Sequence, residues 1–167
     1  MVQSPVKELQ SLRRGPVRLD NFLAEAGQTP LADKGVSGDR LEILAEFEIG
    51  DATEFGFHVR TGNGQRTIVG YDPLKQELFV DRTNSGQSDF HEAFAGRHAG
   101  PLRPQGGRVL MHVFVDTSSV EVFANRGETV ITERIFPEPS SQGVALYSQG
   151  GDTKVRSLQA WHLTSVW

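Results

Sequence analysis

The sequence predicts an all-β fold, specifically a two-sheet antiparallel β-sandwich of the jelly-roll or concanavalin-like type. Three observations support this. Apolar residues alternate with a period of two along many short segments, 18 glycines and 8 prolines are spread mainly between those segments, and three consecutive segments near the middle are joined by tight turns. About ten to twelve short strands with no internal repeat favour a sandwich over a barrel or a propeller.

The central strands are predicted by residues 109–136. Bulky apolar residues alternate through 109–115, and the Thr117-Ser118-Ser119 turn follows. Alternation resumes over 120–123, and Asn125-Arg126-Gly127 supplies residues suited to a second turn. A β-branched run at 129–132 then begins a third strand. This pattern is typical of an antiparallel meander around which the other strands pack.

The flanking segments predict further strands. Alternation over 41–49 predicts a half-buried strand with an acidic outer side, and residues 77–81, 144–148 and 155–166 predict three more. Residues 84–107 are expected to be loop-like, with Phe90 and Phe94 anchored in the core.

The N-terminal part has weaker patterning. Residues 1–30 are expected to form a linker and irregular segment packed on the sandwich, with a turn of helix near 6–12 and another near 21–27. The sandwich domain itself is expected to span 31–167. At 167 residues the chain fits one domain that buries about 70% of its unfolded surface.

Residues 54–71 predict a β-hairpin. Asn63-Gly64 is a strong signal for a two-residue type I′ turn. This turn would pair Gly62 with Gln65, and an uninterrupted ladder would then pair Val59 with Ile68 and place Tyr71 across from Gly56. The hairpin face that points away from the core would then carry Tyr71 together with three polar side chains, those of Glu54, His58 and Arg60.

Composition excludes several functions. The net charge is −4 with no basic block, so nucleic acid and anionic membranes are poor partners. The absence of cysteine excludes disulfides and thiolate chemistry. The five histidines lack metal-ligand spacing, and neither a metal nor a cofactor is expected. No apolar stretch has the ~20 residues of a spanning helix, and there is no signal-peptide core. The chain is therefore expected to be cytosolic or a piece of a larger protein.

Catalytic motifs are also missing. The sequence has no G-x-S-x-G, H-E-x-x-H, P-loop or EF-hand pattern. Asp116 and Glu121 could be mistaken for a glycosidase pair. They flank a tight turn, however, where Asp116 is expected to accept hydrogen bonds from turn amides.

Two segments, Asp116–Asn125 and Arg134–Pro137, have a distinctive pattern that continues in Glu54–Phe57, Tyr71-Asp72, Phe79–Arg82 and Ser157–Leu163. Together they resemble the C-terminal β-sandwich of glycoside hydrolase family 32, which contains the invertases, inulinases and levanases. The motifs of that family's catalytic propeller (Trp-Met-Asn-Asp-Pro-Asn-Gly, Arg-Asp-Pro and Glu-Cys) do not occur here. The resemblance therefore implies a non-catalytic domain, with an enzymatic role the least favoured interpretation.

A related sandwich, carbohydrate-binding module family 66, binds the terminal fructose of levan in bacterial levanases. The resemblance implies such a fructan-binding module, or alternatively an accessory domain that docks on the propeller. It also implies a secreted enzyme with a covalently linked catalytic propeller, and a monomer is expected. A docking domain needs an apolar patch, whereas a binding module needs a polar site, and the polar hairpin face favours the module.

A fructofuranose site requires guanidinium donors and carboxylate acceptors for paired hydroxyls. The hairpin face and the neighbouring strand ends supply such groups within plausible reach of one another. The candidate ligand-binding residues are Glu54, His58, Arg60, Arg66, Tyr71, Asp81 and Arg82. A site at the sandwich edge, built from the 84–107 loops, remains the alternative location.

Overall fold

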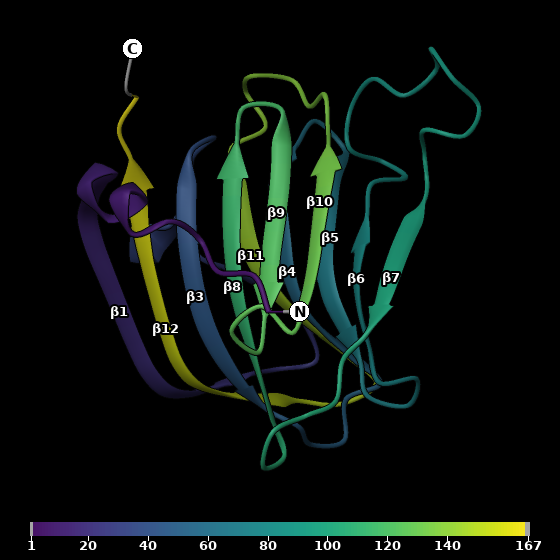
Figure 1. Ribbon diagram of the computed structural model, residues 1–167. Helices are drawn as coiled ribbons and strands as arrows, with labels where there is room; N and C mark the ends of the chain where they lie inside the picture. The colour runs from purple at the N-terminus through teal and green to yellow at the C-terminus, as the bar shows by residue number, and fades with distance from the viewer. Residues whose placement is uncertain (1, 166–167) are drawn as a thin grey trace.

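The computed structural model describes residues 2–165, so Val166 and Trp167, the last residues of the expected sandwich, lie outside it. Two six-stranded antiparallel sheets face each other (Figure 1). The first sheet contains, in spatial order, β1 (Arg13–Ala24), β12 (Thr153–Leu163), β3 (Leu41–Glu48), β8 (Arg108–Asp116), β9 (Ser119–Ala124) and β10 (Thr129–Arg134). The second contains β2 (Gly27–Pro30), β11 (Gly143–Gln149), β4 (Glu54–Gly62), β5 (Gln65–Asp72), β6 (Glu77–Asp81) and β7 (Arg97–Pro101). The predicted two-sheet sandwich is confirmed.

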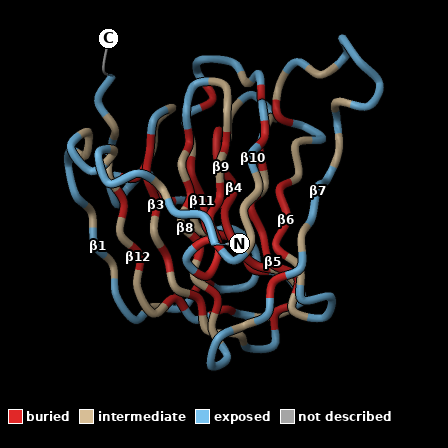
Figure 2. The backbone as a smooth tube through the Cα atoms, in the orientation of Figure 1, coloured by how far each residue is buried: buried red, intermediate tan, exposed pale blue. Residues whose placement is uncertain are grey.

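The core lies between the inner faces of the two sheets. Figure 2 shows buried residues concentrated along the central strands and exposed residues along the edge strands β1 and β7. Phe47 from the first sheet packs against Phe55 and Phe57 from the second, with ring centroids 5.2 and 5.5 Å apart. Burying each such ring contributes about 1.5–3 kcal/mol, so this interlocking aromatic contact helps to hold the two sheets together.

The predicted meander is confirmed as β8, β9 and β10, which pair antiparallel in sequence order. The strand expected at 41–49 is β3. The Asn63-Gly64 turn also forms as expected, with φ of +49° and +74° at the two loop residues. These elements have strong alternation or a specific turn dipeptide, and for that reason their sequences identify them.

The N-terminal segment differs from expectation. Residues 13–30, expected to be irregular with a helical turn near 21–27, form strands β1 and β2. The expected helical turn near 6–12 is the 3₁₀-helix η1 (Lys7–Leu12), and a second such helix, η2, covers Ala32–Lys34. Strand β1 is an exposed edge with a register shift between Arg14 and Val17. Charged residues and the register shift interrupt the alternation of apolar residues along β1, so the sequence pattern does not indicate a strand there.

The 84–107 region also contains a strand, β7, which the sequence did not reveal because Arg97–Pro101 has neither β-branched nor alternating apolar residues. Phe90 is 55% exposed and is not anchored in the core. It contacts Phe94 and Phe136 at the upper end of the sandwich in Figure 1, where the connections after β6 and β10 lie.

The hairpin register is shifted by one residue from the expected one. Gly62 pairs with Gln65 as predicted, but Val59 pairs with Thr67, and Tyr71 lies opposite Phe55. Two residues of β4, Arg60 and Thr61, oppose the single residue Arg66, which makes a β-bulge. Arg60 adopts a left-handed conformation with φ of +51°. The sequence gives no sign of a bulge there because a non-glycine residue occupies the position.

The N-terminal residues lie over the outer face of the first sheet (Figure 1). The amide of Gln3 donates to the carbonyl of Gly127, beyond β9, and η1 leads into the edge strand β1. In the same sheet, Glu42 of β3 is buried and accepts hydrogen bonds from Arg13 and His112. Burial opposes ionisation, but these hydrogen bonds outweigh it and lower the pKa of Glu42 to about 2.

Candidate functional site

Polar and aromatic side chains gather on the outer face of the second sheet, which points away from the core. The pairing places His58, Ile68, Asp81 and Arg97 in one row across β4 to β7. The neighbouring row runs from Tyr147 across Gly56 and Gly70 to Phe79. We call this surface the sheet face and define it by Glu54, His58, Arg66, Phe79, Asp81, Arg97 and Tyr147.

Two paired glycines make room for the aromatic rings of the sheet face. Gly56 of β4 pairs with Gly70 of β5, so neither strand has a side chain at this point. A Cβ atom on Gly70 would collide with the Tyr147 hydroxyl and with the ring of Phe79. Both aromatic side chains therefore lie across the glycine pair, and they are buried although they sit on the outer side of the sheet.

Glu54 connects the two sides of this surface. The Tyr147 hydroxyl donates to Glu54 Oε1 at 3.0 Å, and Arg97 Nη1 donates to Glu54 Oε2 at 3.0 Å. The Arg97 guanidinium carbon lies 3.3 Å from the centroid of the Phe79 ring. Burial, together with the nearby Glu54 carboxylate, raises the pKa of Tyr147, so its hydroxyl stays protonated. The carboxylate and the guanidinium are thereby held in fixed orientations.

His58 lies at the base of the sheet face, beneath its exposed polar groups. Its imidazole stacks on Tyr147 with ring centroids 4.5 Å apart and is only 6% exposed. Nδ1 of this ring is buried without a hydrogen-bond partner. Burial, and to a lesser extent the Arg66 charge, lower the pKa of His58 to about 4. The ring is thus neutral near pH 7 and can either donate or accept a hydrogen bond.

Arg66 and Asp81 provide the more accessible polar groups. Arg66 is exposed on β5, and the half-buried Asp81 accepts the Thr83 amide through Oδ1. Asp81 pairs with Ile68 and with Arg97, which places it between the central and edge strands. Leu78 and Val80 point into the core, as the sequence interpretation required for Asp81 to face outward.

Of the seven predicted residues, the structure brings Glu54, His58, Arg66 and Asp81 together and separates the other three. Tyr71 points into the core, where its hydroxyl donates to the Leu102 carbonyl at 3.0 Å. This expectation was wrong because the bulge in β4 shifts the pairing by one residue, so the β5 residues from Thr67 to Tyr71 take the opposite face from the one expected.

Arg82 faces the gap between the sheets. It forms an ion pair with Glu133 of β10, with Nη1 and Oε2 3.0 Å apart, and its guanidinium lies 4.0 Å from the Phe94 ring centroid. Its sequence neighbour Asp81 points the opposite way, as alternation in a strand requires. Arg82 therefore joins the two sheets and does not contribute to the sheet face.

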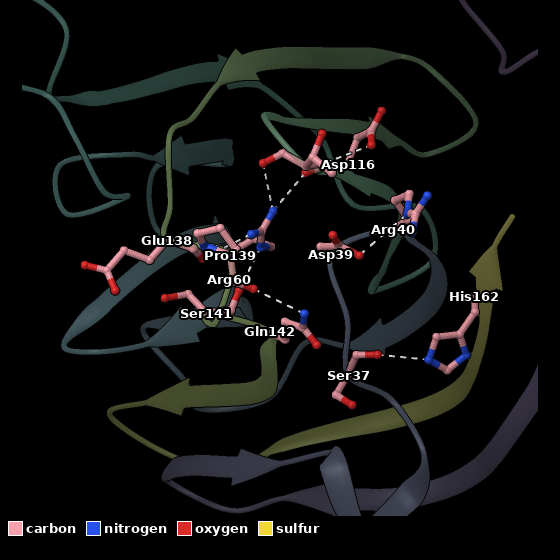
Figure 3. A network of polar contacts seen from close by, with 11 residues as sticks. Ser37, Asp39, Arg40, Arg60, Asp116, Glu138, Pro139, Ser141, Gln142 and His162 are labelled. Carbon is pink, nitrogen blue, oxygen red and sulfur yellow. Dashed lines mark hydrogen bonds and ion pairs between the residues drawn. The ribbon is translucent and has the colours of Figure 1, made fainter. Parts of the chain in front are cut away.

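Arg60 is a structural residue and is only 2% exposed. Its polar contacts with the neighbouring connections are shown in Figure 3. Nε donates to the Ser141 carbonyl at 2.8 Å, Nη1 to the Thr117 and Asp116 carbonyls at 2.8 and 3.3 Å, and Nη2 to the Glu138 carbonyl at 3.3 Å. The bulge turns this side chain towards the end of the sandwich. There one guanidinium ties the β8–β9 turn and the 135–142 connection to β4.

Sequence reasoning missed Tyr147 and Arg97. Tyr147 lies in the strand predicted over 144–148 without being singled out, and Arg97 lies in a segment expected to be loop. The available signal was one glycine inside each of the two adjacent strands, Gly56 and Gly70, because a glycine within a strand leaves space that a neighbouring aromatic side chain can fill. Arg97 belongs to a strand with almost no apolar pattern, and only the tertiary structure brings it to Glu54.

The remaining sequence interpretations concern catalysis and metals. Asp116 Oδ1 accepts the Thr117 amide at 2.7 Å, which confirms its expected role in the turn. Within residues 2–165 no three histidine, aspartate or glutamate side chains form a metal-binding group. Across the same residues, no helix has the length and apolar character needed to cross a bilayer.

Comparison with known proteins finds relatives among enzymes named as levanases and exo-inulinases. The chain is 48% identical over its whole length to a levanase of Bacillus subtilis (strain 168), of which it covers 25%, and 44% identical to a levanase of Bacillus sp. (strain L7), of which it covers 18%. The crystal structure of exo-inulinase from Aspergillus awamori matches with a TM-score of 0.88 at 32% identity, over 99% of this chain and 33% of that chain.

The chain therefore spans a quarter or less of the length of these levanases. Residues 8–162 match the family described as "Glycosyl hydrolases family 32 C terminal", which is nearly the whole chain. The two-sheet architecture, the relatives and this match agree, and the chain belongs to the C-terminal domain family of the family 32 glycosyl hydrolases.

Proposed function

We propose that this chain is a non-catalytic carbohydrate-binding module that recognises terminal fructose in β-fructans such as levan and so targets a linked fructanase to its substrate. The observation that carries the proposal is the fixed Tyr147–Glu54–Arg97 arrangement above the Gly56–Gly70 pair. It presents a carboxylate and a guanidinium, both oriented in advance, beside Arg66 and Asp81.

These groups suit a small ring with many hydroxyls. Each fructose hydroxyl both donates and accepts, so it pairs with a carboxylate oxygen or a guanidinium nitrogen equally well. The neutral His58 ring adds, at the base of the sheet face, a group that can either donate or accept a hydrogen bond. Because Glu54 and Arg97 are already held in place, binding requires little ordering of side chains, which favours affinity.

The relatives support the assignment of ligand and setting. Two levanases match this chain along its whole length, and an extracellular exo-inulinase of Aspergillus awamori matches over 62% of it. By inference from these relatives, the module acts outside the cell as part of a larger enzyme, joined covalently to a catalytic propeller. We propose further that it is a monomer.

A second candidate function is that of an accessory domain that docks on the catalytic domain without binding sugar. The exposed aromatic cluster of Phe90, Phe94 and Phe136 favours it, because apolar surface of this kind marks contact sites. The two functions differ in whether the isolated chain has any affinity for a fructan.

Calorimetric titration of the purified chain with levan, inulin, sucrose and a non-fructan polysaccharide tests the proposal. We expect binding to fructans and no release of reducing sugar. Absence of binding to every fructan would favour the accessory domain. Hydrolysis that disappears when an acidic residue is substituted would contradict the non-catalytic assignment.

A further inference from the structure

A cavity of about 520 Å³ lies at the end of the sandwich, apart from the centre of the sheet face. It is bounded by the loop after β6, by the 135–142 connection after β10 and by Gln65 at the start of β5. In Figure 1 these loops meet at the upper end of the molecule.

The lining of the cavity is polar. Gln87, Ser88, Asp89 and Glu138 supply amide, hydroxyl and carboxylate groups, and none of the lining residues is a lysine, an arginine or a histidine. Arg134 lies beside the lining, with its guanidinium carbon 5.6 Å from the Phe136 ring centroid. The two carboxylates of the lining disfavour anionic ligands. A protein surface that covered these groups would have to match each of them with a hydrogen-bond partner. A neutral, hydroxyl-rich ligand fits this lining best.

One wall of the cavity is aromatic. Phe136 lines it and is 38% exposed. Phe90 and Phe94 flank Phe136, with ring centroids 5.5 and 5.6 Å from its own, and Arg82 covers the Phe94 ring. An exposed ring beside polar groups offers a flat apolar surface for the C–H faces of a sugar, while the polar side chains reach its hydroxyls.

Both walls are held rigidly. The Gln87 amide donates to the Phe136 carbonyl at 3.0 Å, and a Cβ atom on Gly86 would collide with the backbone of Phe136, so the two loops approach as closely as a glycine permits. The Glu138 amide donates to Gln65 Oε1 at 3.1 Å, and Arg60 binds the Glu138 carbonyl. The cavity is therefore already formed before any ligand binds.

The cavity also adjoins the sheet face. Gln65 lines the cavity, while the next residue, Arg66, points to the sheet face. Ile68, the position paired with His58 and Asp81, lies three residues along β5 from Gln65, which corresponds to about 10 Å of strand. A short oligosaccharide can span that distance.

We infer that this cavity is a second sugar subsite, which holds fructosyl units that precede the terminal one bound on the sheet face. The inference rests on the proposed function and extends it, because it makes the ligand an oligosaccharide and not a single fructose. Binding should then strengthen with chain length until both subsites are filled.

Titration with β-2,6-linked fructan oligosaccharides of two to five units tests this inference. We expect affinity for the parent chain to rise about tenfold from the shortest to the longest ligand, as one or two added hydrogen bonds and a ring contact would give. Phe136→Ala and the double variant Gln87→Ala/Asp89→Ala should each abolish the rise and leave affinity for the shortest ligand unchanged. Leu74→Ala removes an exposed apolar side chain from the distant β5–β6 turn and should behave as the parent.

The outcomes separate the two proposals. Terminal recognition without any rise with chain length, or a rise that persists in both cavity variants, overturns the second subsite and leaves the proposed function intact. Absence of binding to ligands of every length overturns the proposed function itself. Thermal unfolding confirms that the variants are folded, and the double variant alters exposed side chains alone.

Discussion

The hydroxyl of Tyr147 in β11 donates to the Glu54 carboxylate in the neighbouring strand β4 at 3.0 Å, although the two residues are 93 positions apart in the chain. This contact is possible because Gly56, the residue paired with Tyr147, has no side chain in the way. It aligns Glu54 so that its second oxygen meets Arg97. Each oxygen of the Glu54 carboxylate thus has its own hydrogen-bond partner, although the residue lies on the outer side of the sheet.

Arg66→Ala tests recognition on the sheet face. Arg66 is exposed, so its guanidinium is available for sugar hydroxyls and its removal should leave the melting temperature within a few degrees of the parent. Losing a charge-assisted hydrogen bond costs about 1.5–3 kcal/mol, and we expect levan affinity to fall about tenfold or more. Arg103→Ala, an exposed arginine beyond the far end of β7, is the matched control for loss of charge and should bind normally.

Arg60→Ala should instead destabilise the fold. The guanidinium donates to four backbone carbonyls from two connections, and without it these acceptors are left unpaired at a buried position. We expect a loss of about 3 kcal/mol or more, which lowers the melting temperature by about 6–12 °C. Arg60→Lys should recover only part of the lost stability, because an ammonium group cannot reach the same set of acceptors. Full stability in Arg60→Ala would contradict the role assigned to this residue.

The buried His58 predicts a pH dependence of stability. Its pKa is about 4 in the folded chain and 6.5 ordinarily, so the unfolded chain binds a proton at a higher pH than the folded one. The contribution of the neutral His58 to the free energy of unfolding is fully present above pH 6.5 and decreases as the pH falls towards 4. In His58→Phe, which keeps a ring to stack on Tyr147, the free energy of unfolding in urea should decrease less between pH 7 and pH 4.5. Equal slopes in variant and parent would show that His58 does not titrate in this way.

Recognition should be of chain ends. Binding along a chain uses rows of aromatic platforms, whereas the sheet face has only buried rings, Tyr147 and Phe79, beneath its polar groups. Capping the non-reducing ends of levan, with chain length unchanged, should therefore remove binding in a pull-down with the immobilised polymer. Levan carried through the same treatment without the capping reagent serves as the control and should bind fully. Undiminished binding after non-reducing-end capping would indicate recognition of internal units.

The sequence was sufficient to predict the sandwich, the meander and the Asn63-Gly64 turn, because each depends on local alternation or on turn chemistry. It was insufficient wherever the pattern is interrupted. The left-handed Arg60 adds a residue to β4 and thereby moves Tyr71 to the core and Arg60 away from the sheet face. Arg97 belongs to an edge strand that lacks apolar alternation, so its pairing with Glu54 could not be foreseen.

The N-terminal residues cross the outer face of the first sheet, whereas the sheet face belongs to the second. Any domain joined ahead of residue 2 would consequently be tethered to the back of the sandwich, with the full thickness of the two sheets between the tether and the sheet face. A polymer bound as we propose could then approach the sheet face without steric hindrance from the tether. The length of the connecting segment would decide how far such a domain can reach along the polymer surface while the module stays attached.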